Sequence, residues 1–151
     1  MDDILHTIRE WYDGPRTGAT THGGEHYWYR SVYLDSEIWD ADEDRYELTH
    51  LSDEALEWEL EITRIFDRWD LARKNGSVIW IEGDDTSFGA LPEEMQNYLD
   101  LNQKLDTYIA ETKPTILARG NFVAGTKKVC WERIDSPGYE FYSLNKKSGI
   151  K

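Results

Sequence analysis

Two adjoining glycines, Gly23 and Gly24, constrain the fold of this chain more than any other feature of its sequence. Both can adopt the positive φ angles that a two-residue hairpin turn requires. The sequence that follows, "EHYWYRSVYL", alternates tyrosines with other side chains at the period of a strand that has two unlike faces. The pattern therefore predicts an antiparallel hairpin whose strands lie at about 17–22 and 26–34.

The periodicity of the remaining sequence predicts three further strands and three helices. Because the two long helices are grouped between hairpins instead of alternating with single strands, the fold class is α+β. We expect an antiparallel sheet of about five strands, with the two long helices packed on one face and a short N-terminal helix. The further strands are expected at about 45–50, 115–123 and 128–134, the long helices at about 53–74 and 92–112, and the short helix at about 3–12.

Length and composition favour one domain over residues 1–151. The chain has 151 residues, of which 39% are hydrophobic and 13% aromatic, enough to bury a core. Residues 137–151 are expected to form a loosely ordered tail. The single cysteine, Cys130, excludes an internal disulfide and is expected to be buried in a strand. Since the sequence has no long apolar run, we expect a cytoplasmic protein that does not associate with a membrane.

Residues 12–18, "YDGPRTG", carry the strongest turn signals of the chain. Asp-Gly followed by proline forces a change of direction. One interpretation is a turn, in which Gly14 has a positive φ and Arg16 pairs with an acidic residue at the surface. The other is an anion site, in which Arg16 and the backbone amides hold a phosphate. We favour the turn.

The same segment, with the "ATTHGGEHYWYRS" that follows, resembles a family of small bacterial proteins with no established activity. That family has a YDGPRxGxA-like start, a hairpin with glycine, histidine and an aromatic residue, a tryptophan-rich helix and an "ALPE" segment. The matching residues are Tyr12 to Gly18, Ala19, His26, Tyr27, Trp58, Trp69 and Ala90 to Glu93. The segment "SVIWIEGDDTSFG" is longer than the family's usual connection. The resemblance implies one domain and implies nothing about mechanism.

Negative charge is concentrated in the first part of the chain. Residues 1–60 carry 16 acidic and 4 basic side chains, a balance of −12, whereas the whole chain carries −13. A field this negative repels the phosphates of nucleic acids and attracts basic partners. We therefore expect a basic protein partner and no direct binding of nucleic acid.

Aromatic side chains surround an acidic loop after the first hairpin. Exposed tryptophan, tyrosine and arginine are the side chains that anchor protein interfaces. The favoured hypothesis is a non-enzymatic binding protein, an inhibitor of a basic partner in the manner of bacterial immunity or phage anti-defence proteins. A homodimer is compatible with this hypothesis. The predicted partner-binding residues are Trp28, Arg30, Tyr33, Trp39, Asp40, Asp42, Glu43 and Asp44.

The alternative hypothesis is a small-ligand binder that sequesters an anionic or nucleotide-like molecule. Its predicted ligand-binding residues are Arg16, Tyr29, Arg30 and Arg119. The two hypotheses differ in a structural consequence. A ligand binder should gather its arginines around one cavity, whereas an inhibitor of a basic protein should show a continuous acidic face.

An enzyme is the least favoured class, because no nucleophile, base and orienting group can be assembled from the sequence. We therefore name no catalytic residue. His22, Glu25 and His26 have the residue types of a two-histidine, one-carboxylate metal site, although a glycine turn separates the histidines. We expect no metal and no cofactor, and leave open only whether these three residues bind a metal.

Overall fold

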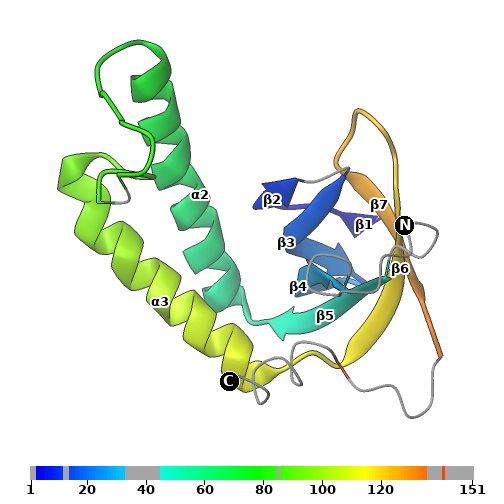
Figure 1. Ribbon diagram of the computed structural model, residues 1–151. Coiled ribbons are helices and arrows are strands. Elements are labelled where there is room, and N and C mark those ends of the chain that lie inside the picture. The colour runs from blue at the N-terminus through cyan, green and yellow to red at the C-terminus, as the bar shows by residue number, and fades with distance from the viewer. Residues whose placement is uncertain (1–2, 12–13, 33–44, 85, 136–140, 142–151) are drawn as a thin grey trace. The chain divides into compact units, whose positions relative to one another are not determined.

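In the computed structural model, seven antiparallel strands form one sheet in the order β1-β7-β6-β5-β4-β3-β2 (Figure 1). The structure describes residues 3–11, 14–32, 45–84, 86–135 and 141, and every structural statement below is confined to them. The strands are β1 Asp3–Ile4, β2 Glu10–Trp11, β3 Pro15–His22, β4 Glu25–Ser31, β5 Arg45–Leu51, β6 Ile116–Phe122 and β7 Lys128–Arg133. All six pairings are antiparallel. The five long strands and the α+β class are confirmed.

The prediction of a helix at residues 3–12 is wrong. This segment instead contains β1 and β2, which raises the number of strands from five to seven. The helical spacing of its apolar residues was misleading, because Leu5 is buried whereas Ile8 and Trp11 are exposed. A helix this short is marginal without tertiary contacts, and here the backbone amides find partners on other strands instead.

The N-terminal segment, residues 3–11, closes the sheet on itself. Its β1 pairs with β7, and the next residue, Leu5, forms a bridge with Thr20 in β3. The amide of His6 then donates to the carbonyl of Ala19 at 2.8 Å. Three strands separate β7 from β3 in the sheet order, so the sheet must curl for one segment to reach both (Figure 1). The closure covers two edges that would otherwise offer unpaired backbone groups.

The concave face of the curled sheet holds the hydrophobic core. Its buried side chains are Leu5, Tyr27, Tyr29, Tyr46, Leu48, Ile116, Ala118, Val129 and Trp131, with Phe122 packed against them. The indole N–H of Trp131 donates to the hydroxyl of Thr20 at 2.9 Å, which links β7 to β3 across the interior. The hydroxyl of Tyr29 donates to the carbonyl of Thr7 at 2.9 Å. Because buried polar atoms need such partners, the aromatic core and the closure depend on each other.

Gly18 permits the N-terminal segment to approach β3 this closely. A Cβ atom at this position would overlap the carbonyl oxygen of Thr7 and would lie 2.8 Å from the hydroxyl oxygen of Tyr29. Glycine is therefore required here for the close approach of two backbones.

The second compact unit, Glu54–Tyr108, holds most of both helices, whereas all strands belong to the first unit, Met1–Asp53 with Ile109–Lys151. We name them the helical unit and the sheet unit. The helices are α2 Asp53–Lys74, the short 3-10 helix η1 Pro92–Glu94 and α3 Met95–Thr112, as predicted. The described part of the chain contains no helix long and apolar enough to cross a membrane.

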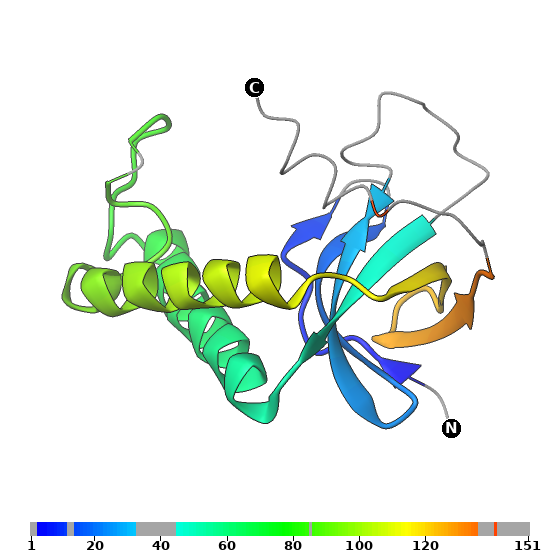
Figure 2. The same ribbon diagram turned by 90° about the horizontal axis from the view of Figure 1, so that it is seen from below.

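Helices α2 and α3 run in opposite directions (Figure 1), and Figure 2 shows that α3 crosses α2 at an angle. Near one end the rings of Trp58 and Tyr108 are 6.2 Å apart, and near the other Arg68 forms an ion pair with Glu94. The packing of these helices on one face of the sheet and the single-domain organisation stay predictions. The predicted tail, 137–151, lies outside the described residues except for residue 141.

Replacing Gly18 with alanine is expected to lower the free energy of unfolding by about 3 kcal/mol or more, because the added methyl group overlaps Thr7. Gly125→Ala is the matched control, since Gly125 has a φ of 78° but no neighbour within 4 Å of an added Cβ. The control should lose about 1 kcal/mol from backbone strain alone. Urea unfolding measures both losses, and equal losses would contradict the close approach.

Candidate functional site

All 4 histidines of the chain lie at one end of the curled sheet. His22 and His26 flank the turn between β3 and β4, where His22 pairs with Glu25. His6 follows β1, and His50 lies near the end of β5 opposite Tyr27. We call these four side chains the histidine cluster.

The turn that carries this cluster is the hairpin that the two glycines predicted. Gly23 has a φ of 61° and Gly24 a φ of 84°, the positive angles of a two-residue turn. Because the turn has only two residues, the strands leave it in register. His22 and His26 therefore project from fixed positions on β3 and β4.

His22 lies between an acidic residue and an arginine. Its Nδ1 atom is 3.1 Å from Oδ2 of Asp3, and its Nε2 atom is 3.2 Å from Nε of Arg133. Since the Nε of arginine always carries a hydrogen, it donates, and Nε2 of His22 accepts. The proton of the neutral imidazole then lies on Nδ1 and is donated to Asp3. This series of contacts, Asp3–His22–Arg133, joins the N-terminal segment to the end of β7.

His6 and His26 form a second contact within the cluster. The Nε2 atom of His6 is 3.2 Å from Nδ1 of His26, and Nε2 of His26 is 3.7 Å from a carboxylate oxygen of Asp53. Burial lowers the pKa of His6 below its usual value of 6.5, and His26 and Lys127 lower it further. The neutral form of His6 is therefore the one that the fold favours.

In the structure, the three residues that sequence analysis left open as a metal site each have a different partner. His22 contacts Asp3, and Glu25 accepts from Nε2 of His50 at 2.8 Å, whereas His26 contacts His6. Across the described ranges, no group of three or more histidine, cysteine, aspartate or glutamate side chains is arranged to hold a metal ion.

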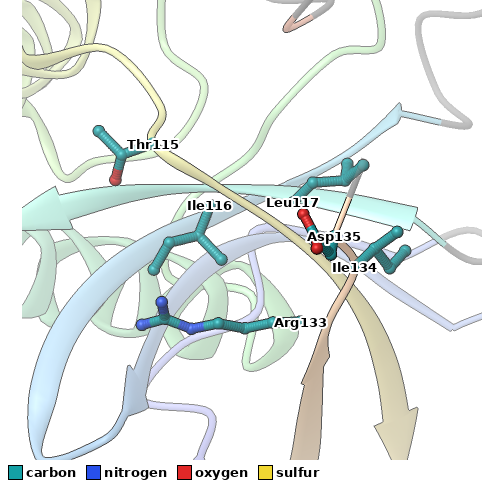
Figure 3. Close-up of a pocket in the computed structure, with 6 residues that line it drawn as sticks. All are labelled: Thr115, Ile116, Leu117, Arg133, Ile134 and Asp135. Carbon is teal, nitrogen blue, oxygen red and sulfur yellow. The ribbon is translucent and has the colours of Figure 1, made fainter. Parts of the chain in front are cut away.

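An open pocket of about 330 Å³ adjoins Arg133 (Figure 3). Its walls come from the start of β6 and from the end of β7 with the two residues beyond it. Thr115, Ile116, Leu117, Arg133, Ile134 and Asp135 line it. Two backbone hydrogen bonds hold the walls, from Thr115 to the carbonyl of Leu48 and from Ile134 to the carbonyl of Leu117.

Arg16 is buried, which corrects the expectation of a surface ion pair. Its side chain lies on the concave face, where a guanidinium nitrogen donates to the hydroxyl of Tyr46 at 3.2 Å and approaches the hydroxyl of Ser31. The hydroxyl of Tyr46 in turn donates to the carbonyl of Pro15 at 2.7 Å. The period-two pattern of β3, which puts Arg16 on the same face as Thr20, is the signal that could have placed it.

The other predicted ligand-binding residues lie on two faces of the sheet. Tyr29 is wholly buried in the core on the concave face. Arg30 and Arg119 lie on the convex face, where Arg30 is opposite Glu47 in the register and Arg119 forms an ion pair with Glu132 at 3.1 Å. Arg16 and these two arginines therefore do not share one wall of a cavity.

Of the predicted partner-binding residues, the structure describes Trp28 and Arg30. Both are half-buried on the convex face of β4, and the guanidinium of Arg9 lies 5.9 Å from the ring centre of Trp28. Tyr33, Trp39, Asp40, Asp42, Glu43 and Asp44 lie outside the described residues. Cys130 is exposed, contrary to the expectation that it would be buried.

Comparison with known proteins finds no matching protein-family model, no similar curated protein and no similar solved structure. The resemblance to the family with the YDGPRxGxA-like start stays a prediction. Function is therefore argued from the geometry of this chain.

Acidification is expected to destabilise the sheet unit through His6. Because the pKa of His6 is lower in the folded chain than its usual value of 6.5, the unfolded chain binds the proton more readily. The stability contributed by neutral His6 is therefore complete above about pH 6.5 and is lost as the pH falls toward the folded pKa. Melting temperatures measured by circular dichroism across this range should fall less steeply for His6→Gln than for the wild type. An equally steep fall in both proteins would contradict this role of His6.

Proposed function

We propose that this chain is a non-enzymatic binding protein that captures a basic protein partner and blocks it by occupying its surface. The observation that carries the proposal is the exposure of three large apolar side chains between residues 71 and 81 of the helical unit, which we name the apolar patch. Leu71, Ile79 and Ile81 are 66%, 84% and 71% exposed. They lie at the end of α2 and in the connection between α2 and α3. Contiguous exposed apolar side chains are typical of protein interaction sites, and we propose that these three form such a surface.

Contacts of Trp80 hold in place the connection that carries Ile79 and Ile81. Trp80 lies between the two exposed isoleucines in sequence, and its ring packs 6.3 Å from Trp69 and 5.2 Å from Phe88. Its indole N–H donates to the carbonyl of Asp84 at 2.8 Å. Because the connection is held in this way, Ile79 and Ile81 need little further ordering on binding, which lowers the entropic cost of association.

The charge around the patch favours a basic partner. The helical unit contains 13 acidic and 5 basic side chains, a balance of −8. Asp67, Glu82 and Glu93 are exposed and form no ion pair with any described residue. Apolar contacts would supply most of the affinity, and the negative field would accelerate the encounter.

The predicted acidic loop would add further negative charge to the chain. Trp39, Asp40, Asp42, Glu43 and Asp44 add an aromatic residue and four acidic side chains to the sheet unit, next in sequence to β4 and β5. We keep them, with Trp28, Arg30 and Tyr33, as a second set of residues that would contact the partner. We also keep the cytoplasm as the proposed compartment, since Cys130 is a free thiol.

Affinity capture from lysate, followed by mass spectrometry, tests this function. The wild-type chain should retain a basic protein, and Ile79→Ser with Ile81→Ser should lose it without a change in melting temperature, because both side chains are exposed. Leu99→Ser is the matched control, since Leu99 is 54% exposed and belongs to α3 instead of the segment between residues 71 and 81.

Three outcomes would contradict the proposal. The wild type could retain no protein, the retained protein could be acidic, or the double variant could retain it as well as the wild type does. Retention should also weaken as salt rises, because the encounter depends on exposed charges.

A further inference from the structure

We propose that the pocket beside β6 and β7 binds a small zwitterion of amino-acid size, with Arg133 holding its carboxylate and Asp135 its ammonium group. This site belongs to the sheet unit and does not depend on the capture of a protein by the helical unit. The pocket volume, about 330 Å³, lies at the lower end of the range of small-molecule sites. A ligand much larger than an amino acid would extend beyond the pocket.

Arg133 is held in a definite direction. Its Nε donates to His22, whose other ring nitrogen is directed at Asp3. The two terminal nitrogens of the guanidinium contact no other described residue, and Figure 3 shows them lying below Ile116. An arginine that is oriented through its Nε and keeps both terminal nitrogens available matches the planar, two-pronged geometry of a carboxylate. Asp3 and His22 act here as positioning residues.

Asp135 supplies the opposite charge. Its exposed carboxylate lines the same pocket and forms no hydrogen bond or ion pair with any described residue. In Figure 3 the carboxylate lies beside Leu117, away from the guanidinium of Arg133. Two opposite charges that line one pocket without pairing are suited to a ligand that carries both charges. The same carboxylate would repel a phosphate or a nucleotide.

The remaining residues that line the pocket favour a ligand with an aliphatic side chain. Ile116, Leu117 and Ile134 give the same pocket apolar surface beside the two charged groups. Aliphatic carbon on this surface would be removed from water, which favours a short branched side chain over a polar one. L-Leucine combines the three features and is the probe of choice.

Titration of the wild-type chain with L-leucine, followed by NMR, tests the ligand class. We expect saturable shifts in the resonances of Ile116 and Ile134. Binding of 4-methylpentanoate, which lacks the ammonium group, and of 3-methylbutylamine, which lacks the carboxylate, should each be about tenfold weaker. Inorganic phosphate should leave these resonances unchanged. The proposal would be overturned if about 10 mM L-leucine, a concentration at which even weak millimolar binding is detected, caused no shift. It would also be overturned if either analogue or phosphate bound as tightly as L-leucine.

Variants of the chain test the residues. Arg133→Gln and Asp135→Asn should each weaken L-leucine binding about tenfold. Arg119→Gln, on the convex face of the neighbouring strand, should leave binding unchanged. The Asp135 side chain is exposed and forms no hydrogen bond or ion pair with any described residue, so its variant should fold normally even if Arg133→Gln does not. Unchanged affinity in Asp135→Asn would overturn the assignment of the ammonium contact.

The positioning role of His22 has its own readout. His22→Gln keeps an acceptor for Nε of Arg133, whereas His22→Phe removes it. L-Leucine affinity should fall in the phenylalanine variant and be largely restored in the glutamine variant, with both variants folded by circular dichroism. Equal affinity in the two variants would overturn the role of His22 in orienting Arg133.

Discussion

The pairing of the N-terminal segment with β3 on one side and β7 on the other is the constraint on which the sheet unit depends. It covers two strand edges, and it places Leu5 in the core between them. The side-chain hydroxyl of Thr7 accepts from the amide of Ala19 at 2.9 Å, while its carbonyl accepts from Tyr29. A sheet of this size with open edges would expose unpaired backbone groups. Closure pairs these groups within the chain, which stabilises the sheet and prevents its edges from pairing with another chain.

The same pairing builds the candidate site. Asp3 reaches His22, and His22 directs Arg133 toward the pocket, so a contact made at the start of the chain orients a side chain at the end of β7. The helical unit presents a different kind of surface, acidic and apolar, for which we propose a protein partner. The chain therefore carries two surfaces of unlike chemistry, one on each unit, and each can be tested without the other.

The sequence was sufficient to predict elements whose signal is local. The glycine turn, the alternation in β4 and the helical periodicity of α2 depend on neighbouring residues, and the structure contains all three elements. The N-terminal helix was wrong because the partners of that segment are strands distant in sequence. Arg16 was misplaced for the same reason, since its burial depends on Tyr46 and Ser31. The pocket was missed because His22 and Arg133, 111 residues apart, meet only in the folded sheet.

Hydrogen exchange at the amides of Leu5, His6 and Arg9 tests the closure most directly. These amides donate to the carbonyls of Lys127, Ala19 and Thr17 at 2.7, 2.8 and 2.7 Å. If the N-terminal segment is part of the sheet, their exchange should be as slow as that of the amides in the centre of β6, because both would open only with the whole sheet unit. Exchange as fast as that of the exposed connection around Gly83, with β6 still protected, would show that the sheet is stable without this segment and would contradict the account.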